Sequence, residues 1–157
     1  MTAEALLIAA RAKGLWLATA ESCTGGLLAG AITTPPGASA IFDRGFVTYT
    51  NEAKQDLLGV REETLAAHGA VSEEVAREMA EGALARSKAQ VAVSVTGIAG
   101  PGGSERKPEG RVCFGLATRE GTSTRTIDFG PLGRDAVRAA TVDHALRLLL
   151  QAVERAP

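Results

Sequence analysis

The sequence predicts an α/β fold with three layers, α/β/α, whose mixed, mostly parallel sheet ends in a C-terminal antiparallel hairpin. Segments rich in strand formers alternate with segments of helical spacing, which is typical of α/β domains. The apolar runs at 15–20 and 90–95 are typical of strands buried on both faces. The strand-like segments 111–119 and 122–129 are joined by Glu120-Gly121, which indicates a hairpin and makes the sheet mixed.

In the N-terminal half, glycine and proline mark where the elements end. Apolar residues at helical spacing precede Gly14, which predicts a helix that ends there. A buried strand, a glycine-rich turn and a short helix follow, and Pro35 and Pro36 cannot continue that helix. Strand formers around Phe46 and Tyr49 predict the next strand. The expected elements are helix 3–13, strand 15–20, turn 21–26, helix 27–32 with its start near Thr24, and strand 42–50.

In the rest of the chain, capping residues mark most of the helices. Asn51 is a favourable N-cap for a helix that ends at Gly59, and a second short helix ends at Gly69. Ser72 opens a longer helix whose first turn carries two glutamates, as the helix dipole favours. The last segment places apolar residues along one helical face. The expected elements are helices 51–58, 61–67 and 72–87, strand 90–95, strands 111–119 and 122–129, and helix 134–153.

Composition and charge exclude several classes of function. The chain has 157 residues, 45% of them hydrophobic and 22% charged, which is typical of one globular domain spanning 1–157. Seventeen basic and eighteen acidic residues leave no positive surplus, so we expect no nucleic-acid partner. No segment suggests a secretory signal or a bilayer span, and the two cysteines suggest no disulfide framework. We therefore expect a cytoplasmic protein that contacts no membrane.

Ser22 is the first candidate for chemistry, because it lies between a buried strand and the start of a helix. Backbone amides of such a turn can hold an anion or a developing oxyanion beside the hydroxyl. The alternative interpretation is an N-cap serine. Gly25 and Gly26 either allow close backbone approach or serve helix packing. The segment lacks the G-x-S-x-G spacing of a hydrolase nucleophile elbow.

A serine nucleophile needs a base, and neither His68 nor His144 is well placed. A lysine serves instead when burial or neighbouring charge depresses the pKa of its ammonium group. Tyr49 and Lys54 lie five residues apart across a strand-to-helix junction and can present a phenol and an amine to one pocket. The alternative is a packed tyrosine and a solvated lysine. Two histidines and two distant cysteines offer no metal-ligand cluster, so we expect no metal.

Residues 96–104 form the strongest local signal. Four glycines and one proline in nine residues follow the most apolar strand, which is costly in conformational entropy unless the backbone must approach a ligand. The alternative is a mobile loop. The charged stretch 105–109 follows, and positive charge near a phosphate could come from Lys107, Arg106 and Arg111. Because ligands bind at the carboxyl ends of strands in such sheets, we expect Ser22, Tyr49 and Thr96 to converge.

Three segments of the chain resemble the motif blocks of the CinA C-terminal-domain family. They are Ala20-Glu21-Ser22-Cys23-Thr24-Gly25-Gly26, Gly45-Phe46-Val47-Thr48-Tyr49 with Lys54, and Val95-Thr96-Gly97-Ile98-Ala99-Gly100-Pro101 with Gly102-Gly103. Segments 59–60, 69–72 and 133–138 extend the resemblance over about residues 5–152. The order and spacing of several blocks make it specific.

The resemblance implies a nicotinamide-nucleotide amidase, which hydrolyses the carboxamide of nicotinamide mononucleotide (NMN) without metal or cofactor. It implies Ser22 as nucleophile, Lys54 as base, and Tyr49 as proton relay or lysine partner. Longer members carry an additional N-terminal domain, so we expect its pyrophosphatase-type activity to be absent here. The expected substrate-binding residues are Thr24, Gly25, Gly26, Ser39, Thr96, Gly97, Gly100, Gly102, Gly103 and either Arg134 or Arg138.

The resulting hypothesis is acyl transfer, with turn amides near residues 23–26, or Thr96, stabilising the oxyanion. We expect the Ser22 hydroxyl and the Lys54 amine within about 2.6–3.2 Å of each other, or one water apart, with Tyr49 adjacent to both. The expected partners are the nucleotide substrate and further copies of the chain in a homo-oligomer. The alternatives are a non-catalytic partner of competence or DNA-damage proteins and a nucleotide-binding regulator.

Overall fold

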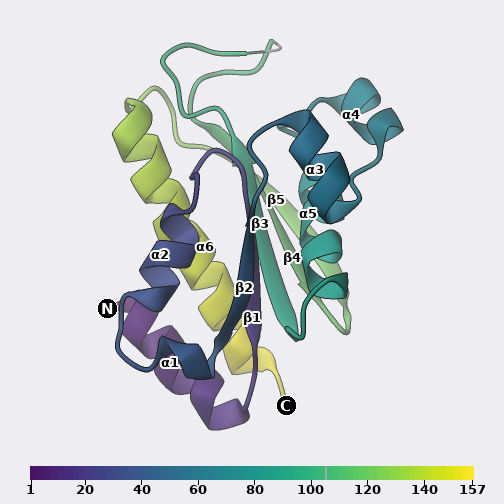
Figure 1. Ribbon diagram of the computed structural model, residues 1–157. Coiled ribbons are helices and arrows are strands. Elements are labelled where there is room, and N and C mark those ends of the chain that lie inside the picture. The colour runs from purple at the N-terminus through teal and green to yellow at the C-terminus, as the bar shows by residue number, and fades with distance from the viewer. Residues whose placement is uncertain (105) are drawn as a thin grey trace.

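The chain folds around a five-stranded sheet with strand order β2-β1-β3-β4-β5 (Figure 1). The computed structural model describes residues 1–104 and 106–157, so Glu105 of the predicted charged stretch lies outside the described residues. The elements are α1 (Thr2–Lys13), β1 (Leu17–Glu21), α2 (Leu27–Thr33), the 3-10 turn η1 (Ala38–Ala40), β2 (Phe42–Val47), α3 (Asn51–Leu58), α4 (Glu62–His68), α5 (Glu73–Ala85), β3 (Val91–Gly97), β4 (Arg111–Thr118), β5 (Gly121–Asp128) and α6 (Arg134–Arg155).

The predicted mixed sheet with its C-terminal hairpin is confirmed. β1 pairs in parallel with β2 on one side and β3 on the other, whereas β3-β4 and β4-β5 are antiparallel. The sheet therefore combines parallel pairs from the N-terminal half with an antiparallel hairpin from the C-terminal half. Four of its strands share one direction, and β4 runs opposite to them.

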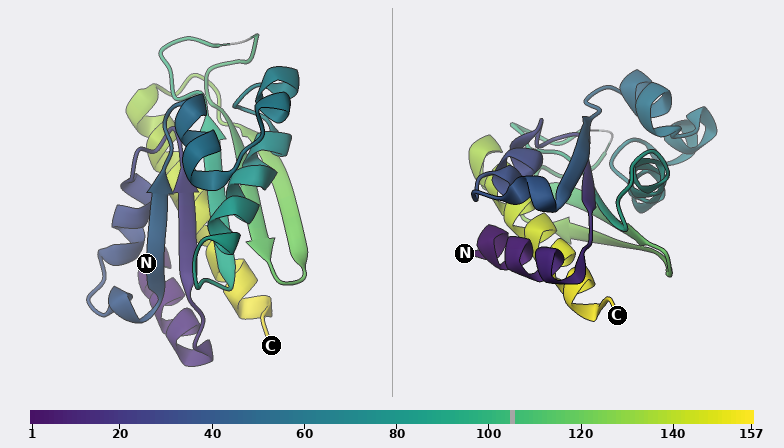
Figure 2. Two further views of the ribbon diagram at one scale, coloured as in Figure 1. Left: turned by 45° about the vertical axis from the view of Figure 1, so that its right-hand side comes forward. Right: turned by 60° about the horizontal axis from the view of Figure 1, so that its bottom comes forward.

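Helices cover both faces of the sheet, with α1, α2 and α6 on one face and α3, α4 and α5 on the other (Figures 1 and 2). Side chains alternate along β1, so Leu17 packs under α1 and α6 while Ala18 packs under α5. Two apolar cores result, one on each face of the sheet. Among the described residues, no helix is both long and apolar enough to cross a bilayer.

Several element boundaries differ from the prediction by one to three residues, and two of the differences lie beside the functional residues. The strand expected to reach residue 50 ends at Val47, because the next two carbonyl groups are bound by the Lys54 side chain rather than by a neighbouring strand. The helix expected to begin near Thr24 begins at Leu27, because Gly25 (φ 57°) and Gly26 (φ 106°) adopt left-handed backbone conformations.

Helix α3 is held close to α5 at a glycine. A Cβ atom built on Gly82 would lie 2.1 Å from the backbone oxygen of Leu58, so α5 approaches the last residue of α3 only because Gly82 has no side chain. The Thr50 hydroxyl caps the other end of α3 by accepting from Ala53 N at 3.0 Å. Asn51, the expected N-cap, is the first helical residue instead. These contacts fix the helix that carries Lys54.

Candidate active site

Ser22 follows directly on β1 and is held by backbone hydrogen bonds on both sides. Its amide donates to Val95 O on β3 at 3.1 Å, and its carbonyl accepts from Gly25 N at 3.1 Å. The residue is 8% exposed. The position of Ser22 is therefore set by the end of the central strand pair and by the glycine turn that follows.

Lys54 reaches Ser22 from α3 although the two residues are 32 positions apart in the sequence. Its Nζ donates to Ser22 Oγ at 2.9 Å, to Thr48 O at 2.9 Å and to Tyr49 O at 3.3 Å. The expected hydrogen-bond distance between the serine and the lysine is thus found. Lys54 is 1% exposed, so the interpretation as a solvated lysine does not hold.

Burial lowers the pKa of Lys54 from 10.5 to about 8, because the charged ammonium loses its hydration. A neutral amine keeps two N–H groups, and the carbonyls of Thr48 and Tyr49 accept both. Its lone pair is then directed at the Ser22 hydroxyl. This arrangement is suited to taking a proton from the serine.

Tyr49 contacts the lysine through its backbone and not through its phenol. The side chain is 57% exposed, and its hydroxyl accepts a hydrogen bond from the Arg134 guanidinium at 2.9 Å. Arg134 also donates to Gly100 O at 2.9 Å. Arg134, on α6, therefore links Tyr49 to the glycine-rich loop. The Tyr49 hydroxyl is bonded to neither Ser22 nor Lys54, contrary to the expected proton relay.

The structure distinguishes the two candidate arginines. Arg134 lines the cavity beside Ser22, whereas Arg138 donates to Cys23 O and Thr24 O, each at 3.2 Å, and does not line it. Arg134 is therefore the arginine available to a ligand. Arg138 holds the turn that follows the serine.

A cavity of about 330 Å³ opens where the three parallel strands end, and its volume suits a small ligand. Predicted site residues that line it are Ser22, Tyr49, Lys54, Thr96, Gly97, Gly100, Gly102, Gly103 and Arg134. Thr24, Gly25 and Gly26 lie in the turn but outside the lining. Cys23, Asn51, Val71 and Lys107 are further lining residues, and of these the sequence singled out Lys107 alone as a cation for the site.

Ser39 does not join the cavity in this chain. It is exposed and lies in η1, immediately before β2. β1 and β2 run parallel, with Leu17 opposite Phe42 and Glu21 opposite Val47. Because η1 precedes β2 and Ser22 follows β1, η1 lies at the N-terminal ends of these strands and Ser22 lies at their C-terminal ends. Within one copy of the chain, Ser39 therefore does not reach the cavity, and the expected substrate contact of Ser39 is not found there.

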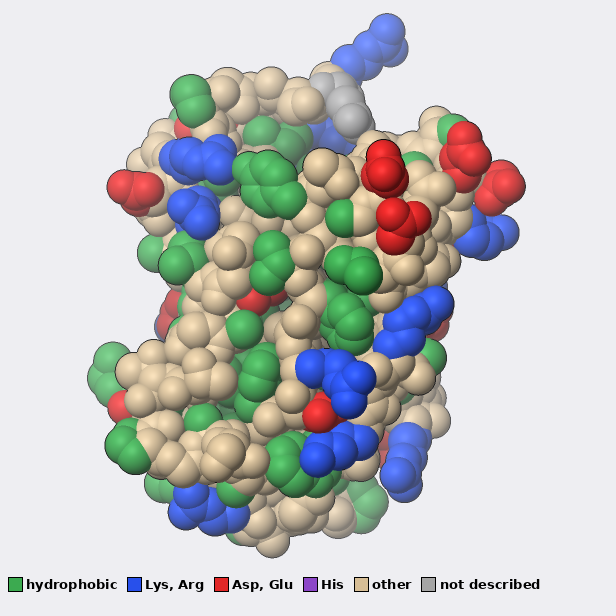
Figure 3. Space-filling model, in the orientation of Figure 1, with side chains coloured by type: hydrophobic (Ala, Val, Ile, Leu, Met, Phe, Trp, Pro, Cys, Tyr) green, Lys and Arg blue, Asp and Glu red, His purple; other side chains and the backbone are tan. Residues whose placement is uncertain are grey.

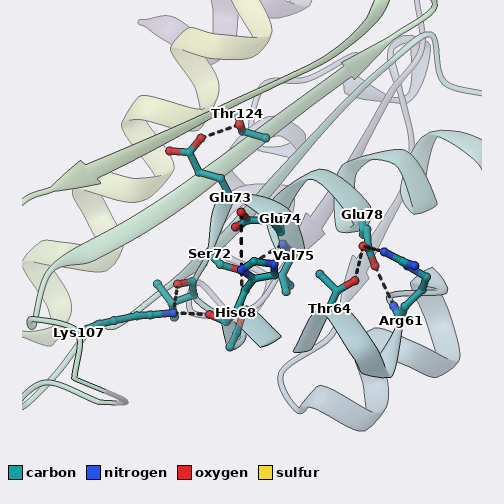
Figure 4. A network of polar contacts seen from close by, with 12 residues as sticks. Arg61, Thr64, His68, Ser72, Glu73, Glu74, Val75, Glu78, Lys107 and Thr124 are labelled. Atoms are coloured by element: carbon teal, nitrogen blue, oxygen red, sulfur yellow. Dashed lines mark hydrogen bonds and ion pairs between the residues drawn. The ribbon is translucent and has the colours of Figure 1, made fainter. Parts of the chain in front are cut away.

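Hydrogen bonds from Lys107 hold the glycine-rich loop against the segment that joins α4 to α5. Lys107 Nζ donates to His68 O at 2.7 Å and to Val71 O at 2.6 Å, as Figure 4 shows. Within the loop, Glu109 Oε1 accepts from Gly102 N at 2.6 Å. Arg111, another expected cation, pairs with Asp128 instead. Lys107 is thus the cation of this stretch that lines the cavity.

One backbone amide of the turn remains for an oxyanion. Gly25 N donates to Ser22 O and Gly26 N to the Glu21 carboxylate, while the Thr96 hydroxyl donates to Ala70 O. By contrast, the amides of Cys23 and Thr24 have no oxygen acceptor among residues 1–104 and 106–157, and of the two residues Cys23 lines the cavity whereas Thr24 is fully buried. In α/β-hydrolases the amide of the residue after the nucleophile is an oxyanion donor, and Cys23 holds that position here.

The described residues of this site favour neither a thiol nucleophile nor a metal centre. Burial raises the pKa of the Cys23 thiol to about 12, so the thiol is protonated and a poor nucleophile. In the part of the chain that the structure describes, no three His, Cys, Asp or Glu side chains gather as metal ligands.

Sequence reasoning gave Glu21 no role in the site and gave Asn51 only the role of an N-cap. A carboxylate at the end of an otherwise apolar strand was the available signal for Glu21, and a polar residue two positions after Tyr49 was the signal for Asn51.

Comparison with known proteins places these residues in context. The family model of the CinA C-terminal domain matches residues 1–153. Nicotinamide-nucleotide amidohydrolase PncC of Escherichia coli K12 is 55% identical over 144 residues, which cover 91% of this chain and 87% of that protein. A CinA-like protein of Chloroherpeton thalassium is 61% identical over 118 residues, which cover 74% of this chain and 28% of that longer protein.

Solved structures share the whole fold. The competence/damage inducible protein CihA of Agrobacterium tumefaciens superposes with a TM-score of 0.94 at 51% identity, covering 98% of this chain and 94% of that one. The competence damage-inducible protein A (ComA) of Klebsiella pneumoniae superposes with a TM-score of 0.95 at 40% identity, covering 99% and 97%.

Proposed function

The chain belongs to the CinA C-terminal domain family, and from that premise we propose that it hydrolyses the carboxamide of NMN to nicotinate mononucleotide and ammonia. The observation that carries the proposal is the 2.9 Å contact between Ser22 Oγ and the buried Nζ of Lys54. The relative from Escherichia coli, whose name gives this activity, supports the choice of substrate. We include in the proposal that residues 1–157 act as one domain and assemble as a homo-oligomer.

The reaction begins with the neutral Lys54 amine, which takes the proton of the Ser22 hydroxyl. The serine oxygen attacks the carboxamide carbon, and the carbonyl oxygen of the substrate becomes an oxyanion near the free amide of Cys23. Lys54 returns the proton to the leaving nitrogen, and ammonia departs. Water then hydrolyses the acyl-serine with Lys54 again as base, which releases the nicotinate product.

The charges around the cavity support an anionic substrate. Lys107 and Arg134 line it together with Lys54, and none of its described lining residues is acidic. The cations and the glycine-rich backbone can bind the 5′-phosphate by charge-assisted hydrogen bonds. Tyr49, the aromatic side chain of the lining, offers a ring face to the cationic pyridinium of NMN.

The surface gives no support to the alternative of a DNA-associated partner. On the face drawn in Figure 3, several Lys and Arg side chains gather at the lower right and acidic side chains gather mainly at the upper right, so the basic side chains do not extend across the whole face. The formal net charge of −1 agrees with this distribution.

Incubation of the purified protein with NMN, followed by assays of ammonia and nicotinate mononucleotide, tests the proposal. We expect Ser22→Ala to lose nearly all activity. Ser87→Ala is the control and should keep the activity, because the Ser87 hydroxyl donates to Ala83 O at the C-terminal end of α5. Intact-mass spectrometry after rapid quenching should detect an acyl adduct on the wild type alone. Binding of NMN without ammonia release would favour a regulator, and full activity in Ser22→Ala would exclude the covalent mechanism.

A further inference from the structure

Glu21 is a fully buried carboxylate directly before the proposed nucleophile. Its Oε1 accepts from the Thr24 hydroxyl at 2.5 Å, from Gly26 N at 3.2 Å and from Leu28 N at 2.9 Å, while Oε2 accepts from Ala29 N at 2.9 Å. No cation of the described chain lies within ion-pair distance of it. Burying a charge without a counter-ion is costly unless hydrogen bonds satisfy it. All the donors here belong to the turn after Ser22 and to the start of α2.

Arg138 holds the same turn from α6. Its Nε donates to Cys23 O and its Nη2 to Thr24 O, and a Cβ built on Gly25 would lie 3.4 Å from Nη2. The turn is therefore held through its N–H groups and the Thr24 hydroxyl by an anion, and through its carbonyl groups by a cation.

These contacts determine where the free amides point. In a trans peptide the N–H lies opposite to the C=O. Because Cys23 O faces Arg138, the N–H of Thr24 points away from that arginine, which does not line the cavity. Because Ser22 O faces Gly25 N, the N–H of Cys23 points out of the turn. Cys23 itself lines the cavity.

We propose that Glu21 and Arg138 are positioning residues that present the Cys23 amide to the oxyanion of the reaction. This inference rests on the proposed function. Neither side chain lines the cavity, so both act through the turn. Their loss should lower the rate of the chemical step while leaving substrate binding and the titration of Lys54 unchanged.

Two matched pairs of variants separate this role from simple stabilisation of the fold. Glu21→Gln is compared with Glu78→Gln, because Glu78 also accepts from a backbone amide and a threonine hydroxyl, those of Arg61 and Thr64 (Figure 4). Glu78 does not line the cavity. Arg138→Met is compared with Arg147→Met, because Arg147 lies on the same helix, pairs with Asp143 and does not contact the turn in the described part of the chain. Thermal unfolding of each variant identifies the folded ones.

Turnover of NMN is the first readout. Loss of one oxyanion donor typically costs about a hundredfold to a thousandfold in kcat. For Glu21→Gln and Arg138→Met we expect a decrease in kcat of at least tenfold, with KM within threefold and the pH midpoint of the rate unchanged. Both controls should stay within twofold of the wild type. If folded Glu21→Gln and Arg138→Met both keep the wild-type kcat, the proposal is wrong.

Labelling by a fluorophosphonate is the second readout, and it does not depend on the identity of the substrate. The Ser22 oxygen forms a bond to phosphorus, the P–F bond breaks, fluoride leaves, Lys54 takes the serine proton, and the P=O group occupies the oxyanion site. Mass spectrometry should show labelling of Ser22 slowed at least tenfold in the two test variants and unchanged in the controls. A wild type that labels without cleaving NMN would refute the substrate alone. Equal labelling rates in the test variants, or no labelling of the wild type, would overturn the positioning role.

Discussion

Replacing Lys54 by methionine tests the proposed base through the pH dependence of stability. Burial lowers the pKa of this lysine from 10.5 to about 8. Below pH 8 the ammonium is charged in the folded and the unfolded chain, so the folded state bears the full cost of burying the charge. Between pH 8 and 10.5 the folded chain has lost the proton and the unfolded chain retains it, so stability rises with pH.

The magnitude follows from the separation of the two pKa values. At about 1.4 kcal/mol per pH unit, the wild type should gain about 3 kcal/mol of unfolding free energy relative to Lys54→Met between pH 7.5 and 10.5. The gain applies to this lysine because its side chain is 1% exposed, so solvent screens it little. Taking the difference between two chains cancels groups that titrate alike in both.

Urea unfolding of both proteins at pH 7.5, 9 and 10.5 measures this difference, with Lys88→Met as the matched control at an exposed lysine. Lys88 is exposed and its ammonium lies over the Trp16 ring, so the control should show a change with pH much smaller than that of Lys54→Met. In parallel, the neutral fraction of Lys54 rises from about one tenth at pH 7 to nine tenths at pH 9, so kcat/KM for NMN should rise about tenfold. A wild-type-minus-Lys54→Met difference that stays constant from pH 7.5 to 10.5, together with a rate independent of pH, would refute Lys54 as a depressed base.

Three further predictions concern the ligand site, metal and packing. Arg134→Ala should lower kcat/KM for NMN by about tenfold to a hundredfold and barely affect nicotinamide riboside, because only NMN carries the phosphate; equal losses would place the phosphate elsewhere. Dialysis against EDTA should leave ammonia release unchanged, and recovery of a lost activity by added zinc would contradict the serine mechanism. Gly82→Ala should lower the unfolding free energy by about 1–3 kcal/mol in urea, because the new methyl group would meet Leu58 O, and a stability gain would show that α5 can move away. Gly30→Ala, at a helical glycine with open space around it, is the control and should stabilise by about 0.5–1 kcal/mol.

Much of the fold could be predicted from the sequence because the residues that end its helices and strands act locally. Glycine at the ends of helices, as at Gly14 and Gly59, requires a left-handed backbone that other residues adopt at a cost, so these positions can be identified without knowledge of the fold. Two of the boundaries that were missed, the end of β2 and the start of α2, lie beside the site. The end of β2 depends on a side chain that returns from α3, and no local pattern reports such a contact.

The sequence by itself determined the order of elements, the mixed sheet and the motif blocks that carry Ser22, Tyr49 and Lys54. The topology alone could have corrected the prediction for Ser39, since the start of one parallel strand and the end of its neighbour lie at opposite ends of the pair. Arg134 and Arg138 are four residues apart and share one face of α6, so spacing could not separate them. Tertiary packing decided which arginine meets the cavity, which group binds the Tyr49 hydroxyl, and how far Lys54 is buried. The physical reason is that hydration and hydrogen-bond partners depend on segments distant in the chain, whereas helix caps and strand patterns depend on neighbours.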